Sequence, residues 1–336
     1  MHNRIQLVAE LAQGFEGKLF LANKLIDGSH KAGVEAVKFQ LVFADELCTP
    51  DYLHYNLFKK LELTFKNWKK IKKKCDKLNI ILYFDIFGKK SLNFSEKLKV
   101  SGVKIHPTDL NNYELLNELS KTKIKIIFLG IGGATLNEII DAVNILKSKK
   151  IVIMLGYQGY PTKHYTNDIS RIQSLREYFY NTKINIEFAF ADHSLPKDRN
   201  ANMAMLLAVG AGVKYIEKHL TIPFYRKLED HESAYKPNDF KKLKKLLNLA
   251  AENFGNYYNL KFEDFKISNE EKKYRLNVRK VLVAKKFLRK NTFINLKDFI
   301  LKRSSSIIGI TDYSLLKKKK LKKDIEKDQA INSKYF

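Results

Sequence analysis

The chain has 336 residues, of which 45% are hydrophobic and 12% aromatic, enough to build a large folded core. No run of 18 or more apolar residues occurs, so we expect no membrane span, and two cysteines in no metal or redox spacing (Cys48 and Cys75) suit a reducing compartment. The net charge of +26 is spread along helix patterns as lysine at solvent-facing spacing, with little arginine, so we interpret it as a solvated surface and expect no nucleic-acid partner.

The N-terminal stretch "MHNRIQLVAELAQG" enters a strand pattern directly, without the basic and apolar regions of a secretion signal, which favours a cytoplasmic protein. From there to about residue 220, a short β-branched or aromatic run alternates with a helical period of apolar residues. The expected strands are 5–10, 35–40, 80–85, 102–107, 125–130, 151–156, 186–192 and 213–219. The expected helices are 17–32, 63–77, 91–99, 112–120, 135–148, 168–180 and 199–211. Eight such units predict an α/β fold, a (β/α)8 TIM barrel.

The pattern changes after residue 220. A polar loop leads to a helix that starts near Pro237, and a charged linker follows. The last 60 residues carry short strand patterns and turns, which indicate a small, separate β-rich module. We therefore expect a barrel at 1–258, a linker at 259–276 and a β-rich domain at 277–336.

In a barrel of this kind the chemistry lies at the C-terminal ends of the strands. His193 and His219 end two successive expected strands, so their side chains should meet at one mouth. Lys38 and Lys104 lie two residues inside their strands, where a buried ammonium is costly unless an anion pairs with it. The other strand ends supply Glu10, Gln40, Asp85, His106 with Asp109, Gly130 and Tyr160.

Several stretches, in order, resemble the sialic acid synthase family: "VAELAQGFEG", "KAGVEAVKFQ", "VKIHPTDLNNYELL", "GGATLNEIIDAV", "GYPT", "ADHSL" and "GAGVKYIEKHLT". The tail, through "RKVLVAKKFLRKNTFI", is similar to the family's antifreeze-protein-like (SAF) domain. The resemblance implies a nonulosonic acid synthase of surface carbohydrate biosynthesis. Such an enzyme condenses phosphoenolpyruvate with an N-acetylated hexosamine.

The resemblance also implies roles for residues of this chain. His193 and His219 match the histidines that hold a divalent metal, with Mn²⁺ expected and Mg²⁺ or Co²⁺ as alternatives. Glu10 matches an acidic residue that acts in proton transfer near the phosphoenolpyruvate. Lys38 and Lys104 match basic residues that contact the donor's phosphate or carboxylate. The expected substrate-binding residues are Gln40, Asp85, Thr108, Asp109, Gln158, Tyr160, Asp230 and Arg303. Arg303 would reach a partner subunit's site, which implies a domain-swapped homodimer.

The departures from the family pattern lie at positions that, by the resemblance, contact the phosphate of the donor. Asp85, Pro107, Gly130 and Ala191 stand where the family has hydroxyl side chains, and Gly14–Phe15 stands in place of an Asn-His pair. Each lost hydroxyl removes a hydrogen bond worth about 0.5–1.5 kcal/mol net, or more to a charged acceptor. A carboxylate at position 85 would also repel a phosphorylated ligand.

Three interpretations follow from these departures. The chain is a synthase with an altered donor site, a relative that uses a phosphate-free partner in an aldol or lyase step, or a catalytically silent sugar-binding paralogue. His106 is either structural or a substitute for a lost hydrogen-bond donor, and His231 is either a lid residue or simply exposed.

Overall fold

The computed structural model describes residues 5–156, 159, 161–196, 200, 202–223, 227–255, 267–305 and 309–336. The chain divides into two compact units, Met1–Asn259 and Leu260–Phe336, and each is considered by itself. Within the described residues, no helix has both the length and the apolar character needed to cross a membrane.

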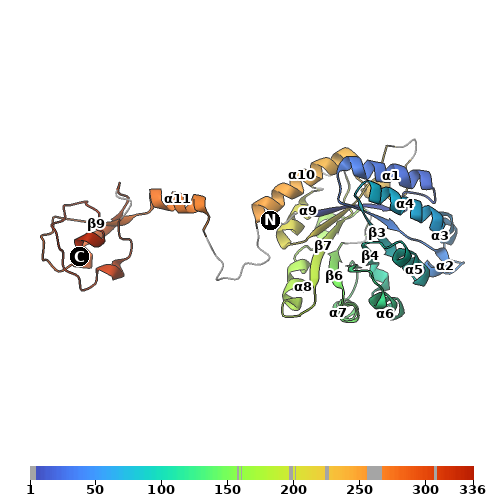
Figure 1. The fold of residues 1–336 in the computed structure, drawn as a ribbon, viewed down its shortest axis with the longest axis horizontal. Helices are drawn as coiled ribbons and strands as arrows, with labels where there is room; N and C mark the ends of the chain where they lie inside the picture. The colour runs from blue at the N-terminus through green and yellow to red at the C-terminus, as the bar shows by residue number, and fades with distance from the viewer. Residues whose placement is uncertain are drawn as a thin grey trace. The chain divides into compact units, whose positions relative to one another are not determined.

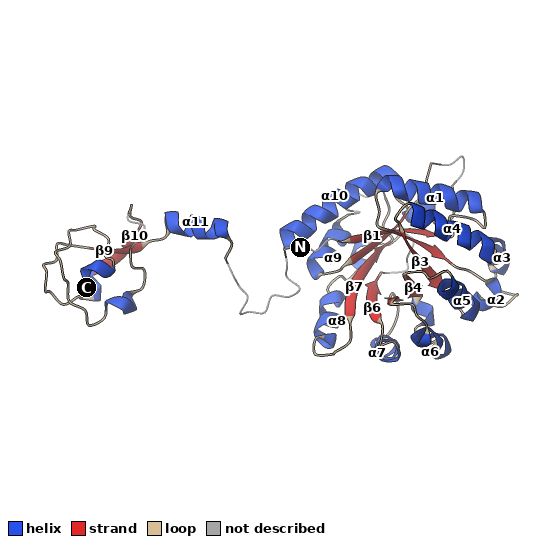
Figure 2. Ribbon diagram, in the orientation of Figure 1, coloured by secondary structure: helices blue, strands red, loops and turns tan. Residues whose placement is uncertain are grey.

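The first unit is a closed barrel of eight parallel strands in sequential order, which confirms the predicted (β/α)8 architecture (Figures 1 and 2). The strands are β1 (Gln6–Ala12), β2 (Ala36–Gln40), β3 (Ile81–Ile86), β4 (Gly102–Ile105), β5 (Ile126–Gly130), β6 (Lys150–Leu155), β7 (Ile186–Asp192) and β8 (Tyr215–His219). The helices around them are α1 (Leu19–Ala32), α2 (Ala44–Leu47), α3 (Tyr55–Leu61), α4 (Phe65–Lys77), α5 (Lys89–Lys97), α6 (Tyr113–Lys121), α7 (Leu136–Ile145), α8 (Arg171–Phe179), α9 (Met203–Ala211) and α10 (Pro237–Phe254). The short helices α2 and α3 lie where the sequence analysis assigned no element.

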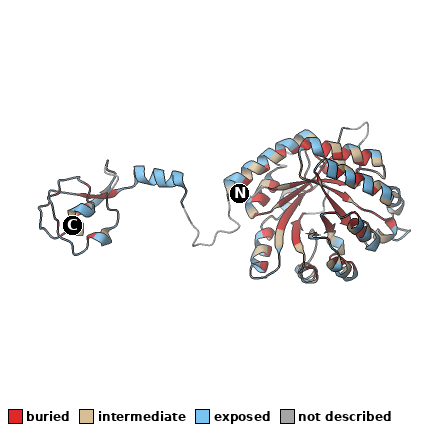
Figure 3. Cartoon of the chain, in the orientation of Figure 1, coloured by how far each residue is buried: buried red, intermediate tan, exposed pale blue. Residues whose placement is uncertain are grey.

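Side chains alternate between the lumen and the helix layer along each strand, as the pleat requires. Val8, Tyr83 and Phe128 belong to the core inside the lumen, whereas neighbours such as Leu7 and Phe84 join the larger core beneath the helices. Both faces of the strands are therefore buried, and the helices bury only their inner sides (Figure 3). This explains why the strands appear in the sequence as almost continuous apolar runs.

Local signals fix where several helices begin and end. Thr135 caps α7, and its hydroxyl and Glu138 form a reciprocal capping box. Gly33 ends α1 in the left-handed conformation (φ 73°), which glycine adopts without a steric penalty.

An aromatic cluster packs between β1, β2, β3 and α4. The ring of Phe15 lies edge-on to Phe39 (5.7 Å between centroids) and Trp68 (5.5 Å), and Trp68 is edge-on to Phe84 (5.0 Å). Phe15 is fully buried in the core beneath the helices. Phe15, which the resemblance aligns with a polar residue, is therefore a packing residue of this core.

The second unit contains α11 (Asn269–Val278), an antiparallel pair of strands, β9 (Val281–Ala284) and β10 (Phe299–Lys302), and short 3₁₀ turns. Isolated bridges join Val283 to Ala330 and Leu288 to Ile325, and the two strands cover a small core that includes Leu282, Phe299 and Ile325. The range 259–276, expected as a linker, thus contains most of α11, none of whose described side chains is buried.

Candidate active site

The two predicted histidines meet at the C-terminal ends of neighbouring strands. His193 follows β7 and His219 ends β8, both side chains are buried, and their ring centroids lie 5.5 Å apart with the planes tilted by 54°. Burial, together with the neighbouring His193, lowers the pKa of His219 well below its usual value. His219 is therefore a neutral imidazole at pH 7, the form that ligates metal ions.

A buried ion pair braces the two strands directly before the histidines. Asp192 and Lys218 are partners in the β7–β8 register, and Lys218 Nζ lies 2.5 Å from Asp192 Oδ2. Neither side chain is exposed, and Lys218 also donates to the carbonyl of Ser194 (2.8 Å) and lies over the ring of Tyr235. The Ser194 hydroxyl donates to the same Asp192 oxygen (2.7 Å). Because side chains alternate along a strand, this pair faces the helix layer while the histidines face the lumen.

Five ionisable side chains fill the lumen close to the histidines, and we call them the charged layer: Glu10, Lys38, Asp85, Lys104 and Glu217. All five are buried. Lys38 Nζ contacts the Glu10 carboxylate and lies 2.6 Å from Asp85 and 3.5 Å from Glu217, which in turn lies 2.9 Å from Lys104 Nζ. The requirement that buried lysines be paired is met entirely within the barrel.

Protonation in the charged layer follows from burial and pairing. Burial, reinforced by Glu217 and Asp85, raises the pKa of Glu10 to about 8 despite the nearby Lys38. Burial acts on Glu217 in the same direction, but Lys104 and Lys38 outweigh it and lower its pKa to about 2. Burial lowers the pKa of Lys38, whereas Asp85, Glu10 and Glu217 together raise it well above its usual value. At pH 7 Glu10 is therefore protonated and Lys38 is charged.

A bulge in β1 holds Glu10 in place. The β1–β2 register shifts between Glu10 and Ala12, Ala12 adopts a positive φ of 36°, and its N–H donates to Glu10 Oε1 (2.7 Å). Bulges of this kind are common at barrel rims beside active sites, where they direct a side chain.

Polar side chains form the rim around the mouth. Gln13 donates to Gln40 (2.7 Å), and its N–H lies 3.4 Å from an oxygen of Asp230. Asp109 is partly buried in the turn after β4, and burial raises its pKa. In the same turn His106 Nδ1 pairs with the Thr108 hydroxyl (2.9 Å), and burial lowers the pKa of His106 to about 4.

The remaining predicted residues are distributed differently. Gln158 and Tyr160 lie outside the described residues. Arg303 is an exposed residue of the second unit. His231 is partly buried, with its ring 3.1 Å from the carbonyl of Leu228 and 3.2 Å from Glu232.

Glu217 and Gln13 were not predicted from the sequence. Glu217 stands two residues before His219 on the same strand, so alternation places it on the lumen side with that histidine. Alternation along β8 was thus the signal that could have identified Glu217. Gln13 follows the bulge in β1, which no periodic pattern reveals.

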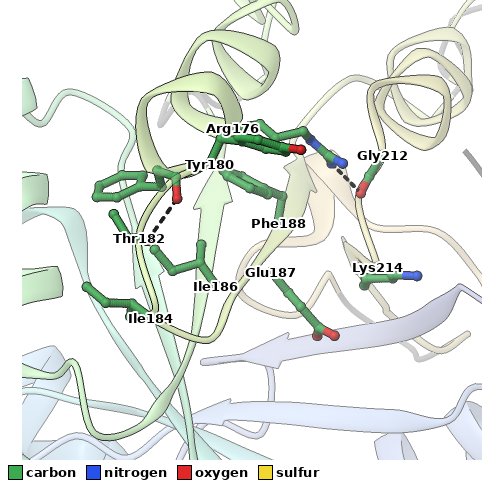
Figure 4. A pocket seen from close by; sticks show the side chains of 10 residues that line it. Arg176, Tyr180, Thr182, Ile184, Ile186, Glu187, Phe188, Gly212 and Lys214 are labelled. Carbon is green, nitrogen blue, oxygen red and sulfur yellow. Dashed lines mark hydrogen bonds between the residues drawn. The ribbon is translucent and has the colours of Figure 1, made fainter. Parts of the chain in front are cut away.

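A separate hollow of about 290 Å³ lies at the opposite ends of β7 and β8 (Figure 4). Its lining includes Arg176, whose guanidinium donates to the carbonyls of Ala211 (3.1 Å) and Gly212 (2.8 Å) at the end of α9. Glu187, also in the lining, pairs with Lys150 at 2.8 Å. These charged groups secure the base of the barrel, and the face that carries the histidines is the other one.

Comparison with known proteins agrees with the barrel fold. The sequence profile of the NeuB family matches residues 25–258. The N,N'-diacetyllegionaminic acid synthase of Campylobacter jejuni is 27% identical over an alignment 344 residues long, which covers 97% of this chain and 98% of that protein. The crystal structure of an N-acetylneuraminic acid synthetase from Leptospira borgpetersenii, in complex with citrate, is 26% identical with a TM-score of 0.71 over 82% of this chain and 92% of that one.

The fold likeness extends along almost the whole chain. A spore coat polysaccharide biosynthesis protein of Bacillus subtilis superposes with a TM-score of 0.64 at 21% identity, covering 99% of this chain and 95% of that one. The matched profile spans most of the barrel, including the strands that carry Lys38, Lys104, His193 and His219. The chain therefore belongs to the NeuB family.

Proposed function

We propose that this protein catalyses the carbon–carbon bond-forming step of nonulosonic acid synthesis, in which a three-carbon donor condenses with the aldehyde of an N-acetylated hexosamine. The observation that carries the proposal is the convergence of His193 and His219, 5.5 Å apart, next to a buried layer of lysines and carboxyls in a NeuB-family barrel. Relatives of this chain include N,N'-diacetyllegionaminic acid, pseudaminic acid and N-acetylneuraminic acid synthases.

The donor set fits a divalent metal, with manganese expected. Two imidazoles from rigid strand ends are suitable ligands, and His219 is neutral at pH 7. Among the described residues no group of three or more histidine, cysteine or acidic side chains could hold an ion, so His193 and His219 would share it with water and substrate. When bound there, the metal would polarise the sugar aldehyde.

The protein's own groups have separate parts in this proposal. Glu10, protonated at pH 7, holds a proton beside the donor, and Lys38 and Lys104 supply positive charge near the donor's anionic group. The rim residues Gln40, Asp109 and Asp230 face the sugar, and Gln158 and Tyr160 are assigned to the same surface from the resemblance. Thr108 joins this rim through its contact with His106.

The second unit belongs to the same proposal. We assign it as an SAF-type domain whose exposed Arg303 reaches the active site of a second copy in a domain-swapped dimer. Light scattering should show a dimer in solution, and a monomer at assay concentration would contradict this part.

Phosphoenolpyruvate is the donor that the resemblance implies. With it, C3 of the donor bonds to the aldehyde carbon, water adds at C2, inorganic phosphate leaves, and the aldehyde oxygen takes a proton. A phosphate-free donor in an aldol step is the second candidate, and the Lys38–Asp85 pair favours it.

The test is a product screen. The full-length protein is incubated with Mn²⁺, with phosphoenolpyruvate or pyruvate, and with a panel of N-acetylated amino sugars, and products are identified by mass spectrometry. With either donor we expect a product whose mass equals that of the sugar plus pyruvic acid. If no pair gives this mass while an amino sugar still binds in calorimetry, the protein is a silent sugar-binding paralogue and the proposal is wrong.

A further inference from the structure

Asp85 engages the lysine that is most deeply buried in the charged layer. Lys38 is 1% exposed, its Nζ lies 2.6 Å from Asp85 Oδ2, and it also contacts Glu10 and lies near Glu217. An ammonium group has only three N–H donors, and three carboxyl groups surround this one. An incoming anion must therefore compete with Asp85 for Lys38.

Little positive charge is left for a phosphate in this part of the lumen. Lys104 is paired with Glu217 at 2.9 Å. His106 adds no positive charge, because burial lowers its pKa to about 4 and leaves it neutral at pH 7. Both ammonium groups of the charged layer are thus already paired with a carboxyl group before any ligand enters, Lys38 with Asp85 and Lys104 with Glu217.

Beside the charged layer, apolar groups occupy the positions at which the family pattern has hydroxyl side chains. A side chain at Gly130 would begin 2.8 Å from Cδ of Pro107, so the proline ring already fills the space in which a serine would stand. Gly156 likewise packs against Ala191, whose Cβ lies 2.9 Å from where a side chain at 156 would begin. The departures at Pro107 and Gly130 are therefore complementary in shape, and together with Ala191 they leave an apolar wall in place of hydrogen-bond donors.

The second oxygen of Asp85 indicates what kind of ligand fits. Asp85 Oδ1 is buried and accepts no hydrogen bond from the residues that the structure describes. A buried acceptor of this kind favours a ligand that brings a donor. An ionised phosphate brings only acceptors, whereas the enol form of a 2-oxo acid carries an O–H group.

We propose that Asp85 is a specificity-determining residue that makes the donor subsite take a three-carbon 2-oxo acid with a single carboxylate, of the pyruvate class, instead of a phosphorylated donor. This inference rests on the proposed condensation and names its donor. Lys104 receives the single carboxylate, and Asp85 remains on Lys38 with its free oxygen toward the enol. A doubly charged phosphate would have to enter beside the Asp85 carboxylate, which costs Coulomb energy in a buried site.

The corresponding reaction is an aldol addition and balances without a further reactant. C3 of the 2-oxo acid loses a proton and its C2 oxygen takes one as the enol forms. C3 then bonds to the aldehyde carbon, the C2 oxygen gives up its proton as the ketone returns, and the aldehyde oxygen takes a proton. No group leaves, so the reverse cleavage, which releases the 2-oxo acid, is also accessible.

The test measures donor binding directly, by calorimetry on the full-length protein with pyruvate and with phosphoenolpyruvate in metal-free buffer. We expect the wild type to bind phosphoenolpyruvate at least about tenfold more weakly than pyruvate. Asp85→Asn keeps the shape and removes the charge, so it should tighten phosphoenolpyruvate binding by about tenfold or more and change pyruvate binding by less than about threefold. Asp141→Asn, an exposed neutralisation on α7, is the matched control and should change neither affinity.

Two results would overturn the inference: a wild type that binds phosphoenolpyruvate more tightly than pyruvate, or an Asp85→Asn variant with an unchanged ratio of affinities. The wild-type ratio decides the question even if the variant does not fold. The product screen separates this inference from the proposed function. Condensation with phosphoenolpyruvate but not with pyruvate would retain the proposed function and refute the role of Asp85. The expected shift in affinity without any product would support the role of Asp85 and refute the proposed function.

Discussion

Buried charge has different effects behind the strands of the barrel and inside its lumen. On the β7–β8 wall, Asp192 and Lys218 pair behind the strands, outside the lumen, and leave His193 and His219 directed into the mouth. Inside the lumen the charges come from four strands, where Asp85 of β3 and Glu217 of β8 engage Lys38 of β2 and Lys104 of β4. Behind the strands a buried ion pair therefore positions the two histidines, whereas inside the lumen the same interaction occupies lysines that could otherwise bind an anion.

The largest effect is expected from breaking the pair behind the histidines. Lys218→Met leaves the Asp192 carboxylate buried without its ammonium partner, and should lower the free energy of unfolding by about 3–5 kcal/mol. Urea denaturation followed by circular dichroism measures this change.

Two further variants test whether the lost stability comes from the buried Asp192–Lys218 pair. Asp192→Leu combined with Lys218→Met removes both charges and should recover most of the lost stability. Lys89→Met breaks an exposed pair with Glu114 and should have no measurable effect. A Lys218→Met protein as stable as the wild type would show that the pair does not brace the strands.

A smaller effect concerns the pH dependence set by Glu10. Its pKa of about 8 in the folded barrel lies above the ordinary value of 4.5, so between these values the folded state holds a proton that the unfolded state has lost. Stability then falls as pH rises from about 5 to 8, by on the order of 1 kcal/mol per pH unit from this residue. Glu10→Gln mimics the protonated form and should remove that slope in urea denaturation at several pH values.

The outcome that would contradict this assignment is a pair of parallel stability profiles for wild type and Glu10→Gln. Parallel profiles would mean that Glu10 is already ionised in the folded barrel at pH 7. The charged layer would then hold one more negative charge than its lysines balance.

Most of the fold could be predicted because each barrel strand is buried on both faces and is followed by a helix with its own apolar period. The helices α2 and α3 were missed because four and seven residues are too few to establish a helical period. The charged linker pattern likewise concealed α11, whose capping box at Ser268 and Glu271 is a local signal without an apolar stripe.

The site was predictable where its residues lie at or near the ends of the expected strands. That position brought His193 and His219 together and placed Lys38 and Lys104 near the mouth, but the partners of these lysines depend on register across the barrel. The pairing of Lys38 with Asp85 spans two neighbouring strands, and that of Lys104 with Glu217 crosses the lumen. Likewise, the contact of Pro107 with Gly130 joins two departures that looked independent along the chain.

The most direct test of the account is a titration of the full-length protein with Mn²⁺, followed by the loss of the free-ion signal in electron paramagnetic resonance. We expect one ion bound per chain, and none in the same concentration range when His193 and His219 are both replaced by alanine in a protein that still folds. If the double variant takes up Mn²⁺ as tightly as the wild type, or if the wild type takes up none, the two histidines do not form the metal site on which the proposed condensation depends.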